Sequence, residues 1–276
     1  MNNYKITASI VLYNTPGVLI NRLLTCIRNS GCINTIYIVD NSPVPNQQLV
    51  FEDLPVEYIQ TQRNIGYGSG HNIALRKAIK LGSDFHFVFN PDISFEDAEL
   101  QKMISRICDD KEIGQLMPKV INPDGSLQYL CKLLPTPLDL VLRRFAIGPL
   151  KRIAKVRADE FELRFSGYRN EMNVPFLSGC FMLFRVSALQ KIGLFDESFF
   201  MYGEDIDLTR RMHAKYKTIF FPSAVVIHDH AKESYKNIKM LWIHSVNVGK
   251  YFNKWGWFLD AERKKMNTAV IKSLTD

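Results

Sequence analysis

Residues 56–92 read VEYIQTQRNIGYGSGHNIALRKAIKLGSDFHFVFNPD, and the order of patterns in this stretch decides the fold class. Runs rich in Val, Ile, Tyr and Phe at 56–62 and 84–90 are typical of β-strands. Between them, the apolar spacing of 72–82 predicts a helix that ends at Gly82. A strand, a helix and a second strand in this order indicate a βαβ unit with parallel strands.

The same alternation continues on both sides of this unit. Further strands are predicted at 7–13 and 34–40, and further helices at 17–29 and 95–108. Such an alternation predicts an α/β fold with a mostly parallel, twisted sheet and helices on both faces. Ligands of such sheets bind at the carboxyl ends of the strands. The residues that follow each strand are therefore the first candidates for a site.

The second half of the chain is less regular. A buried strand is predicted over 173–186, with a break at Ser178-Gly179, and strands follow at 217–222 and 223–230. The C-terminal region has a helical pattern. We expect it to form a helical extension after the α/β part of the chain.

The composition of the 276 residues is that of a core-forming globular protein, with 46% hydrophobic and 23% charged residues. We expect neither a secretory signal nor a membrane-spanning segment, because the apolar stretches are too short. Five cysteines, an odd number without a CxxC pair, indicate reduced thiols and a cytoplasmic location. The net charge of +7 includes a basic segment, 143–157, with six basic residues and no acidic one.

Gly66, Gly68 and Gly70 stand between a predicted strand and a predicted helix. Glycine lets backbone N–H groups approach a phosphate, and the N-terminus of a helix favours its charge. A flexible surface turn is the alternative. The GxGxG spacing differs from the GxGxxG of dinucleotide-binding proteins and follows the third strand, so NAD binding is not expected.

Two further positions could hold a metal ion. Asp92 follows the strand that ends at Asn90, where an Asp is either a turn residue or, beside a phosphate-binding turn, a ligand for Mg²⁺ or Mn²⁺. His228 ends another apolar strand. It is either a buried, hydrogen-bonded histidine or a ligand that suits Mn²⁺ better than Mg²⁺.

The stretch FFMYGEDIDLTRRM, residues 199–212, places Glu204, Asp205 and Asp207 directly behind an aromatic run. Carboxylates crowded beside an apolar wall cost free energy unless a cation or a reaction makes use of them. Within a helix, Asp207 can pair with the arginines that follow it, and we interpret it as structural.

In combination, these motifs resemble the family 2 glycosyltransferases of fold type A, particularly the bacterial rhamnosyltransferase-like group. The resemblance covers roughly residues 5–230 and rests on SIVLYN, IVDNS, RNIGYGSGHN, FNPD, SGCFMLFR and FDESFFMYGEDIDLTRR, in this order. It implies a glycosyltransferase domain over 1–230, with a nucleotide-sugar-binding half at 1–115 and an acceptor and catalytic half at 116–230. Residues 231–276 are then the helical extension.

The resemblance also implies an inverting transfer from a nucleotide-sugar donor to a saccharide or lipid-linked acceptor, in the synthesis of cell-surface polysaccharide. Asn14 and Asp40 match positions that face the nucleobase, and Arg63 and Asn64 match the turn beside the nucleotide. Donor binding is assigned to Asn14, Asp40, Arg63, Asn64, Gly66, Gly68 and Asn90.

For the metal, Asp92 matches the last Asp of the DxD motif, and His228 resembles the histidine that completes the coordination in some relatives. Asn90 stands where the motif has its first Asp, so the affinity for Mg²⁺ or Mn²⁺ is expected to depend on Asp92, His228 and the donor diphosphate. Asp205 matches the catalytic base, and we interpret Glu204 as acceptor-binding.

Two other functions remain as alternatives. A sugar-phosphate nucleotidyltransferase could use the same sheet, turn and metal, and a non-enzymatic module could bind nucleic acid or membrane through the basic segments. No nucleic-acid-binding motif occurs, and nucleic acid is not expected as a partner.

The segment 137–157 combines its basic residues with the apolar residues Leu140, Phe145, Ile147, Leu150 and Ile153. This combination predicts that the segment binds peripherally to an anionic membrane surface, namely the inner face of the cell membrane. An amphipathic helix packed on the sheet is the alternative.

Overall fold

The computed structural model describes residues 4–229, except 47, 48, 50 and 52, and residues 238–275. The strands are β1 (Ile6–Leu12), β2 (Thr35–Asp40), β3 (Val56–Gln60), β4 (Phe85–Phe89), β5 (Ile93–Phe95), β6 (Ile113–Ile121), β7 (Cys131–Lys132), β8 (Met172–Asn173), β9 (Phe176–Leu177), β10 (Phe181–Arg185) and β11 (Lys217–His228). The helices are α1 (Gly17–Ser30), α2 (Tyr67–Lys80), α3 (Glu99–Asp109), α4 (Pro137–Phe145), α5 (Leu150–Phe161), α6 (Val186–Ile192), α7 (Glu204–His213), α8 (Ile238–Trp255) and α9 (Ala261–Thr275), with a 3-10 turn at Arg164–Ser166.

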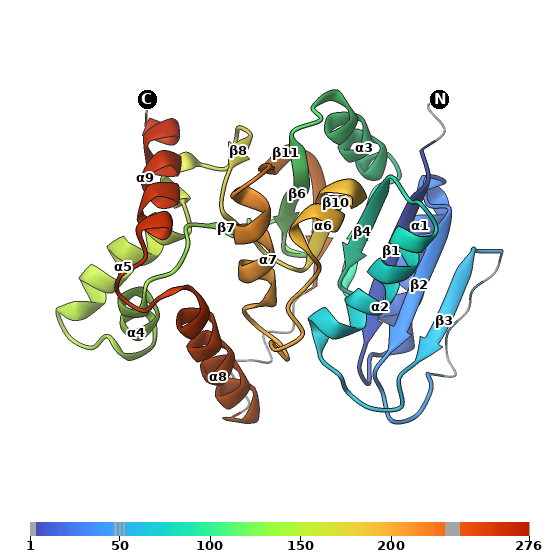
Figure 1. The fold of residues 1–276 in the computed structure, drawn as a ribbon, viewed down its shortest axis with the longest axis horizontal. Helices are drawn as coiled ribbons and strands as arrows, with labels where there is room; N and C mark the ends of the chain where they lie inside the picture. Colours follow the sequence, from blue (N-terminus) through green and yellow to red (C-terminus); the bar gives the residue numbers. More distant parts are fainter. Residues whose placement is uncertain (1–3, 47–48, 50, 52, 230–237, 276) are drawn as a thin grey trace.

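The predicted α/β fold is confirmed. Within the described residues, one large sheet has the order β3-β2-β1-β4-β10-β6-β11-β5, and β8 pairs with β11 (Figure 1). Strands β1 to β4 are mutually parallel, and β11 is parallel to β6, whereas β10 runs antiparallel to both of its neighbours. The sheet is therefore purely parallel in the first half of the chain and mixed in the second.

Helices cover both faces of this sheet, as the alternation of strands and helices predicts. The apolar sides of α1 and α3 pack with β1 and β4 in the main core. Helices α2, α6 and α7 cover the opposite face through a second cluster that includes Leu75, Phe184 and Leu208. A small sheet of β7 and β9 lies between the large sheet and the C-terminal helices.

Several boundaries differ from the sequence-based prediction. Helix α2 begins at Tyr67 instead of 72, so Gly68 and Gly70 lie in its first turn and Gly66 is its N-cap residue. Glycine has a low intrinsic helix propensity, but packing overrides it here. Helix α3 begins at Glu99 instead of 95, because residues 93–95 pair with β11 as strand β5.

The second half also differs in detail. The single strand predicted over 173–186 is divided into β8, β9 and β10, which pair with β11, with β7, and with β4 and β6, respectively. Conversely, the two strands predicted over 217–230 form the one strand β11, with a register shift between Phe221 and Val225. A bulge of this kind bends a strand without ending it.

Candidate active site

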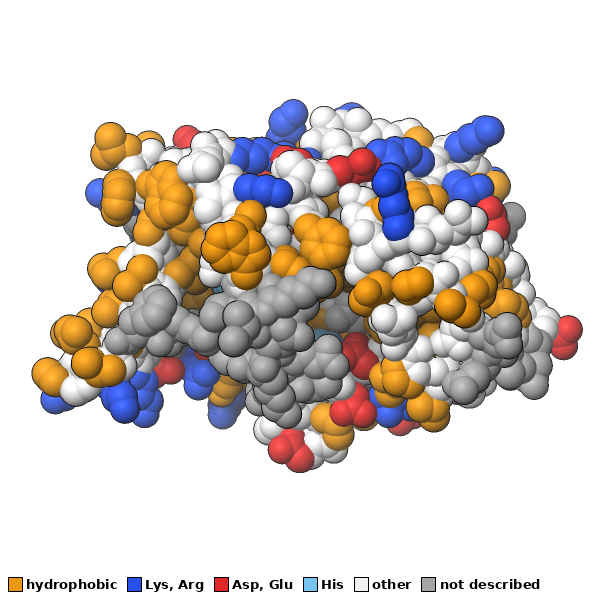
Figure 2. Space-filling view, turned by 90° about the horizontal axis from the view of Figure 1, so that it is seen from below, with side chains coloured by type: hydrophobic (Ala, Val, Ile, Leu, Met, Phe, Trp, Pro, Cys, Tyr) orange, Lys and Arg blue, Asp and Glu red, His pale blue; other side chains and the backbone are white. Residues whose placement is uncertain are grey.

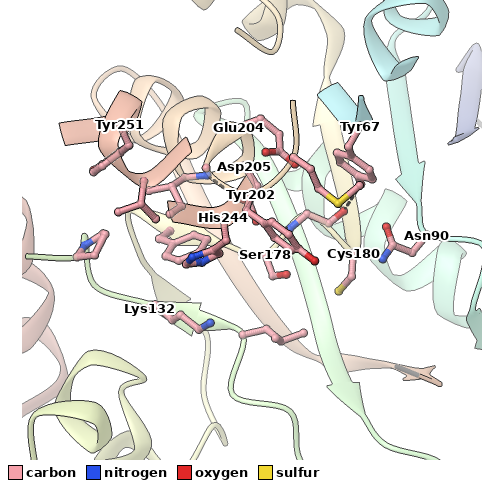
Figure 3. A pocket seen from close by; sticks show the side chains of 18 of the residues that line it. Tyr67, Asn90, Lys132, Ser178, Cys180, Tyr202, Glu204, Asp205, His244 and Tyr251 are labelled. Carbon is pink, nitrogen blue, oxygen red and sulfur yellow. Dashed lines mark hydrogen bonds between the residues drawn. The ribbon is translucent and has the colours of Figure 1, made fainter. Parts of the chain in front are cut away.

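A cavity of about 550 Å³ lies where the carboxyl ends of the large sheet meet the small sheet and helix α8 (Figure 3). It brings together residues that are far apart in the sequence. The first half of the chain contributes Val11, Tyr67, Asn90, Pro91 and Asp92. The second half contributes, among others, Lys132, Ser178, Gly179, Glu204, Asp205, His228 and His244.

Asp205 lies at the start of α7, as predicted, and its carboxylate is held by two backbone groups. Oδ2 accepts a hydrogen bond from the Gly179 N–H at 3.0 Å, and Oδ1 accepts one from the Ile206 N–H at 2.9 Å. The N-terminus of a helix favours negative charge. These two hydrogen bonds fix the orientation of the Asp205 carboxylate, and Asp205 lines the cavity.

Glu204 lines the same cavity but has a different environment. Its side chain is buried, and its Oε2 has no hydrogen-bond partner in the described part of the chain. Burial, together with the charge of Asp205, raises the pKa of Glu204 well above its usual value. Burial also raises the pKa of Asp205, although hydrogen bonds from Gly179 and Ile206 oppose that effect. The buried Glu204 carboxyl thus favours its protonated form, whereas the two N–H groups favour the ionised form of Asp205, which is the form able to accept a proton.

Asp92 and His228 meet at the other side of the cavity. The pairing of β5 with β11 brings them together, and the Asp229 N–H donates to the Asp92 carbonyl at 3.0 Å. Asp92 Oδ1 lies 3.3 Å from His228 Nε2. Burial disfavours a charge on His228, but Cys180 and Asp92 offset this effect and raise its pKa, and a metal ion bound at Nε2 would take the place of the proton there.

The Asp92–His228 pair has the geometry of two ligands of one cation. Adjacent ligands at about 2.1 Å from an octahedral metal ion are about 3 Å apart. Two protein ligands leave coordination positions for the oxygens of a diphosphate. The two residues therefore fit Mn²⁺ or Mg²⁺, and Asn90, which lines the cavity beside them, adds a neutral amide.

Asn14 and Asp40 lie outside the cavity lining, at the ends of β1 and β2. Asp40 is fully buried, and its carboxylate accepts hydrogen bonds from the Ser42 and Asn46 N–H groups and from the Tyr58 hydroxyl. Asn14 is exposed, has a positive φ of 50°, and donates its N–H to Ser42 Oγ at 2.8 Å. Both residues shape the loop at the end of the sheet, and Asn14 faces solvent there.

The glycines of the turn are explained by close packing. A Cβ atom on Gly66, which has a φ of +92°, would lie 2.3 Å from the Phe200 carbonyl oxygen. A Cβ on Gly68 would lie 3.0 Å from Phe195 Cβ. The Gly66 N–H donates to Asn64 Oδ1 at 3.0 Å, and the Tyr67 N–H donates to the Phe200 carbonyl at 3.0 Å. These two N–H groups are therefore used within the protein, while Arg63 is exposed beside them.

Sequence reasoning missed several residues of the site. Lys132 lies in the two-residue strand β7, which has too short a pattern to be recognised. Tyr202, in the aromatic run, has a φ of 68° and contacts His244 of α8 with ring centroids 5.3 Å apart. Tyr67 lies within the glycine-rich stretch, and the presence of an aromatic residue among glycines is the only sequence signal that could have indicated its role in the site.

The C-terminal helices are part of the site, because α8 lines the cavity with His244, Val248, Tyr251 and Phe252. Two buried acidic groups hold these helices in place. Asp207 accepts from Arg211 at 2.9 Å and from Trp255 Nε1 at 2.8 Å, which confirms its structural role. The Arg210 guanidinium makes two hydrogen bonds of 2.7 Å to Asp260.

This sheet topology, with the candidate base Asp205 and the candidate metal-binding residues Asp92 and His228 in one cavity at the carboxyl edge, is consistent with an enzyme that transfers a group from a nucleotide sugar. The family model of the glycosyltransferase-like family 2 matches residues 7–241, and the chain belongs to this enzyme family. The predicted family is therefore confirmed.

The curated relatives agree with this assignment. The chain is 28% identical over 189 residues to an N-acetylglucosaminyl-diphospho-decaprenol L-rhamnosyltransferase of Mycobacterium tuberculosis, a match that covers 64% of this chain and 59% of the relative. It is 23% identical over 210 residues to the galactofuranosyltransferase GlfT1 of the same organism, with 74% and 63% covered. The chain thus spans about three fifths of the length of these relatives.

Solved structures share the fold at low sequence identity. S. aureus TarS 1–349 in complex with UDP has a TM-score of 0.57 at 16% identity, with 97% of this chain and 70% of that chain covered. A mannosyltransferase from Pyrobaculum calidifontis, in complex with GDP-Man and Mn²⁺, has a TM-score of 0.57 at 14% identity, with 98% and 75% covered. These likenesses confirm the expected glycosyltransferase fold.

Proposed function

We propose that this protein is an inverting glycosyltransferase that moves a sugar, of the rhamnose type, from a nucleoside-diphosphate sugar to a hydroxyl group of a saccharide or lipid-linked acceptor. The observation that carries the proposal is the position of Asp205, held by two N–H groups in the same cavity as Asp92 and His228. The rhamnosyltransferase relative supports the sugar and the lipid-linked acceptor, and the family supports sugar transfer. We propose that this transfer serves the synthesis of surface polysaccharide.

The proposed reaction is a single displacement. The acceptor hydroxyl transfers its proton to Asp205 while its oxygen bonds to the anomeric carbon. The bond from that carbon to the diphosphate oxygen breaks, and the electron pair leaves with the nucleoside diphosphate. Glu204, which holds its proton, donates a hydrogen bond to the acceptor. Attack and departure on opposite faces of the carbon invert its configuration.

Asp92 and His228 would hold Mn²⁺ or Mg²⁺ beside the donor diphosphate. A bound divalent cation supplies electrostatic stabilisation of the charge on a leaving phosphate oxygen. The mannosyltransferase structure in complex with GDP-Man and Mn²⁺ supports this role. We propose that the loops at Asn14, Asp40 and Arg63 contact the nucleotide at the adjacent edge of the sheet.

A panel of sugar nucleotides tests the proposal. We expect one donor to release nucleoside diphosphate slowly in water and faster when an acceptor is added. Release of pyrophosphate from a nucleoside triphosphate and a sugar phosphate would instead show a nucleotidyltransferase. The family membership favours transfer of the sugar over this alternative and over a binding module.

We also propose that the protein works at the inner face of the cell membrane. Among the described residues, no helix is long and apolar enough to cross a bilayer. Ile147, Leu150 and Ile153 are exposed, and the basic residues Lys151, Arg152 and Lys155 of α5 are exposed near them in the sequence. Leu140 is an exception, because it packs against Phe199 and lines the cavity. The Phe145 side chain lies outside the described part.

A second exposed apolar segment lies beside helices α4 and α5. Phe258 and Leu259 are 82% and 96% exposed in the loop between α8 and α9. Arg263 joins that loop to the start of α4, because its guanidinium donates to the Pro135 and Trp257 carbonyls. Figure 2 shows hydrophobic and basic side chains gathered at the end of the molecule that carries α4 and α5. Together they form a surface that fits an anionic bilayer.

Replacing both Phe258 and Leu259 with Ser is expected to weaken binding to anionic vesicles at least about tenfold, because each buried apolar side chain contributes about 1.5–3 kcal/mol. Co-sedimentation with vesicles that contain phosphatidylglycerol measures the effect. Val18, 73% exposed on α1, supplies the control Val18→Ser, which should bind as the wild type does. Equal binding of the wild type to neutral and anionic vesicles would contradict the proposal.

A further inference from the structure

The glycine-rich stretch carries one side chain whose role the glycines do not explain. Tyr67 donates its hydroxyl to the Gly179 carbonyl at 2.6 Å, and the Gly179 N–H donates to Asp205 Oδ2 at 3.0 Å (Figure 3). We propose that Tyr67 is a positioning residue, which holds the Gly179 backbone so that its N–H directs the carboxylate of Asp205. This inference rests on the proposed role of Asp205 as the base.

Gly179 is confined between the two residues that it connects. A Cβ atom at this position would lie 3.3 Å from Asp205 Cβ and 3.5 Å from Tyr67 Cε1. The next residue is fixed as well, because the Asn90 N–H donates to the Cys180 carbonyl at 2.9 Å. A shift of Gly179 would therefore move the N–H that holds Asp205.

Tyr67 is itself held rigidly from several sides. Its ring packs edge-on against His71, with centroids 4.4 Å apart, and against Phe195, with centroids 6.2 Å apart. His71 in turn is hydrogen-bonded to Ser9 of β1 at 2.7 Å. Burial raises the pKa of Tyr67 well above its usual value, so its hydroxyl stays protonated and donates.

The arrangement connects the two halves of the site. Gly66 and Gly68 allow the first turn of α2 to approach Phe200 and Phe195, and this approach brings the Tyr67 hydroxyl to Gly179. We propose that the glycine-rich turn lies beside the donor. Two hydrogen bonds, which meet at Gly179, therefore join this turn to Asp205, the proposed base. Side chains held in this way keep a reacting group within a few tenths of an ångström of its productive position.

The variant Tyr67→Phe removes the hydroxyl and keeps the ring. We expect kcat to fall about tenfold, because a general base contributes about 10²–10⁴-fold and part of that depends on its orientation. The KM for the donor should stay within about twofold, because the ring still packs in place. Single-turnover transfer and steady-state kinetics measure both quantities.

The pH profile distinguishes positioning from a general loss of structure. Asp205 faces Glu204 on its own helix, Lys132 from β7 and Tyr67 from α2. The hydrogen bond from the Gly179 N–H lowers the pKa of Asp205. If Tyr67→Phe loosens Gly179, the pKa of Asp205 should rise, and the acidic limb of the profile of kcat against pH should move to higher pH. Transfer requires the ionised base, and activity is therefore lost as the pH falls through that limb.

Tyr216→Phe is the matched control, because Tyr216 packs against the same hydrophobic cluster as Tyr67 and does not line the cavity. It should leave kcat and the pH limb unchanged. Gly179→Ala is a second variant. It should lower kcat and leave the donor KM unchanged, because the added methyl group would crowd the Asp205 side chain. Thermal unfolding verifies that each variant is folded.

An unchanged kcat and pH limb in Tyr67→Phe would overturn the positioning role, as would a rise in donor KM without a shift of the limb. Asp205→Asn separates this failure from that of the proposed function. If Asp205→Asn loses transfer and Tyr67→Phe does not, only the positioning role is wrong. If Asp205→Asn retains transfer, Asp205 is not the base and both proposals fail.

Discussion

Replacing Asp205 with Asn is expected to slow sugar transfer at least about a hundredfold, which is the usual scale for the loss of a general base. The amide cannot accept the proton of the acceptor hydroxyl, whereas it keeps the size of the carboxylate. Donor affinity should stay within about twofold, because the donor binds without proton transfer. Single-turnover transfer and calorimetry with the donor measure the two quantities on one preparation.

The folded state should survive this change. The amide oxygen can still accept from one of the two N–H groups, so the expected cost is about 1–3 kcal/mol of unfolding free energy. Asp207→Asn is a matched control on the same helix. Asp207 is buried against Arg211 and Trp255 and does not line the cavity, so this variant should lose stability and keep its transfer rate per folded molecule. Transfer by Asp205→Asn within a few-fold of the wild type would leave Asp205 with a structural role only.

The second large effect concerns the metal. We expect Mn²⁺ to tighten the binding of nucleoside diphosphate at least about tenfold, or about 1.4 kcal/mol, over binding in EDTA, because a cation held by Asp92 and His228 would attract the diphosphate oxygens. Asp92→Ala should abolish that gain, since it removes the carboxylate of the Asp92–His228 pair. Isothermal calorimetry in Mn²⁺, in Mg²⁺ and in EDTA measures the gain without reference to activity.

Two variants make this test specific. Asp229→Ala removes an exposed carboxylate one residue from His228 that does not line the cavity, and it should keep the full metal dependence. Asn90→Asp adds a second carboxylate at the edge of the cavity and should strengthen the binding of the metal. Equal affinity of the wild type for the nucleotide in Mn²⁺ and in EDTA would show that Asp92 and His228 serve another purpose.

The sequence by itself determined the α/β class, the strands of the parallel half and the family. These follow from local patterns, because the alternation of apolar runs with helical spacing is visible within 56–92. It also placed Asp92 at the end of β4 and Asp205 at the start of α7, since polar residues after a strand and acidic residues at the start of a helix are local signals.

Only the tertiary structure decided what these residues contact. The glycines at 66 and 68 have the same sequence pattern whether they cradle a phosphate or pack against another chain segment, and here Phe200 and Phe195 occupy the space of their missing side chains. The partner that directs Asp205 is the Gly179 backbone, 26 residues away, and the residue that holds Gly179 is Tyr67, 112 residues from it. The Gly179–Asp205 contact lies within the second half of the chain and the Tyr67–Gly179 contact joins the two halves, and both depend on tertiary packing that no local spacing encodes.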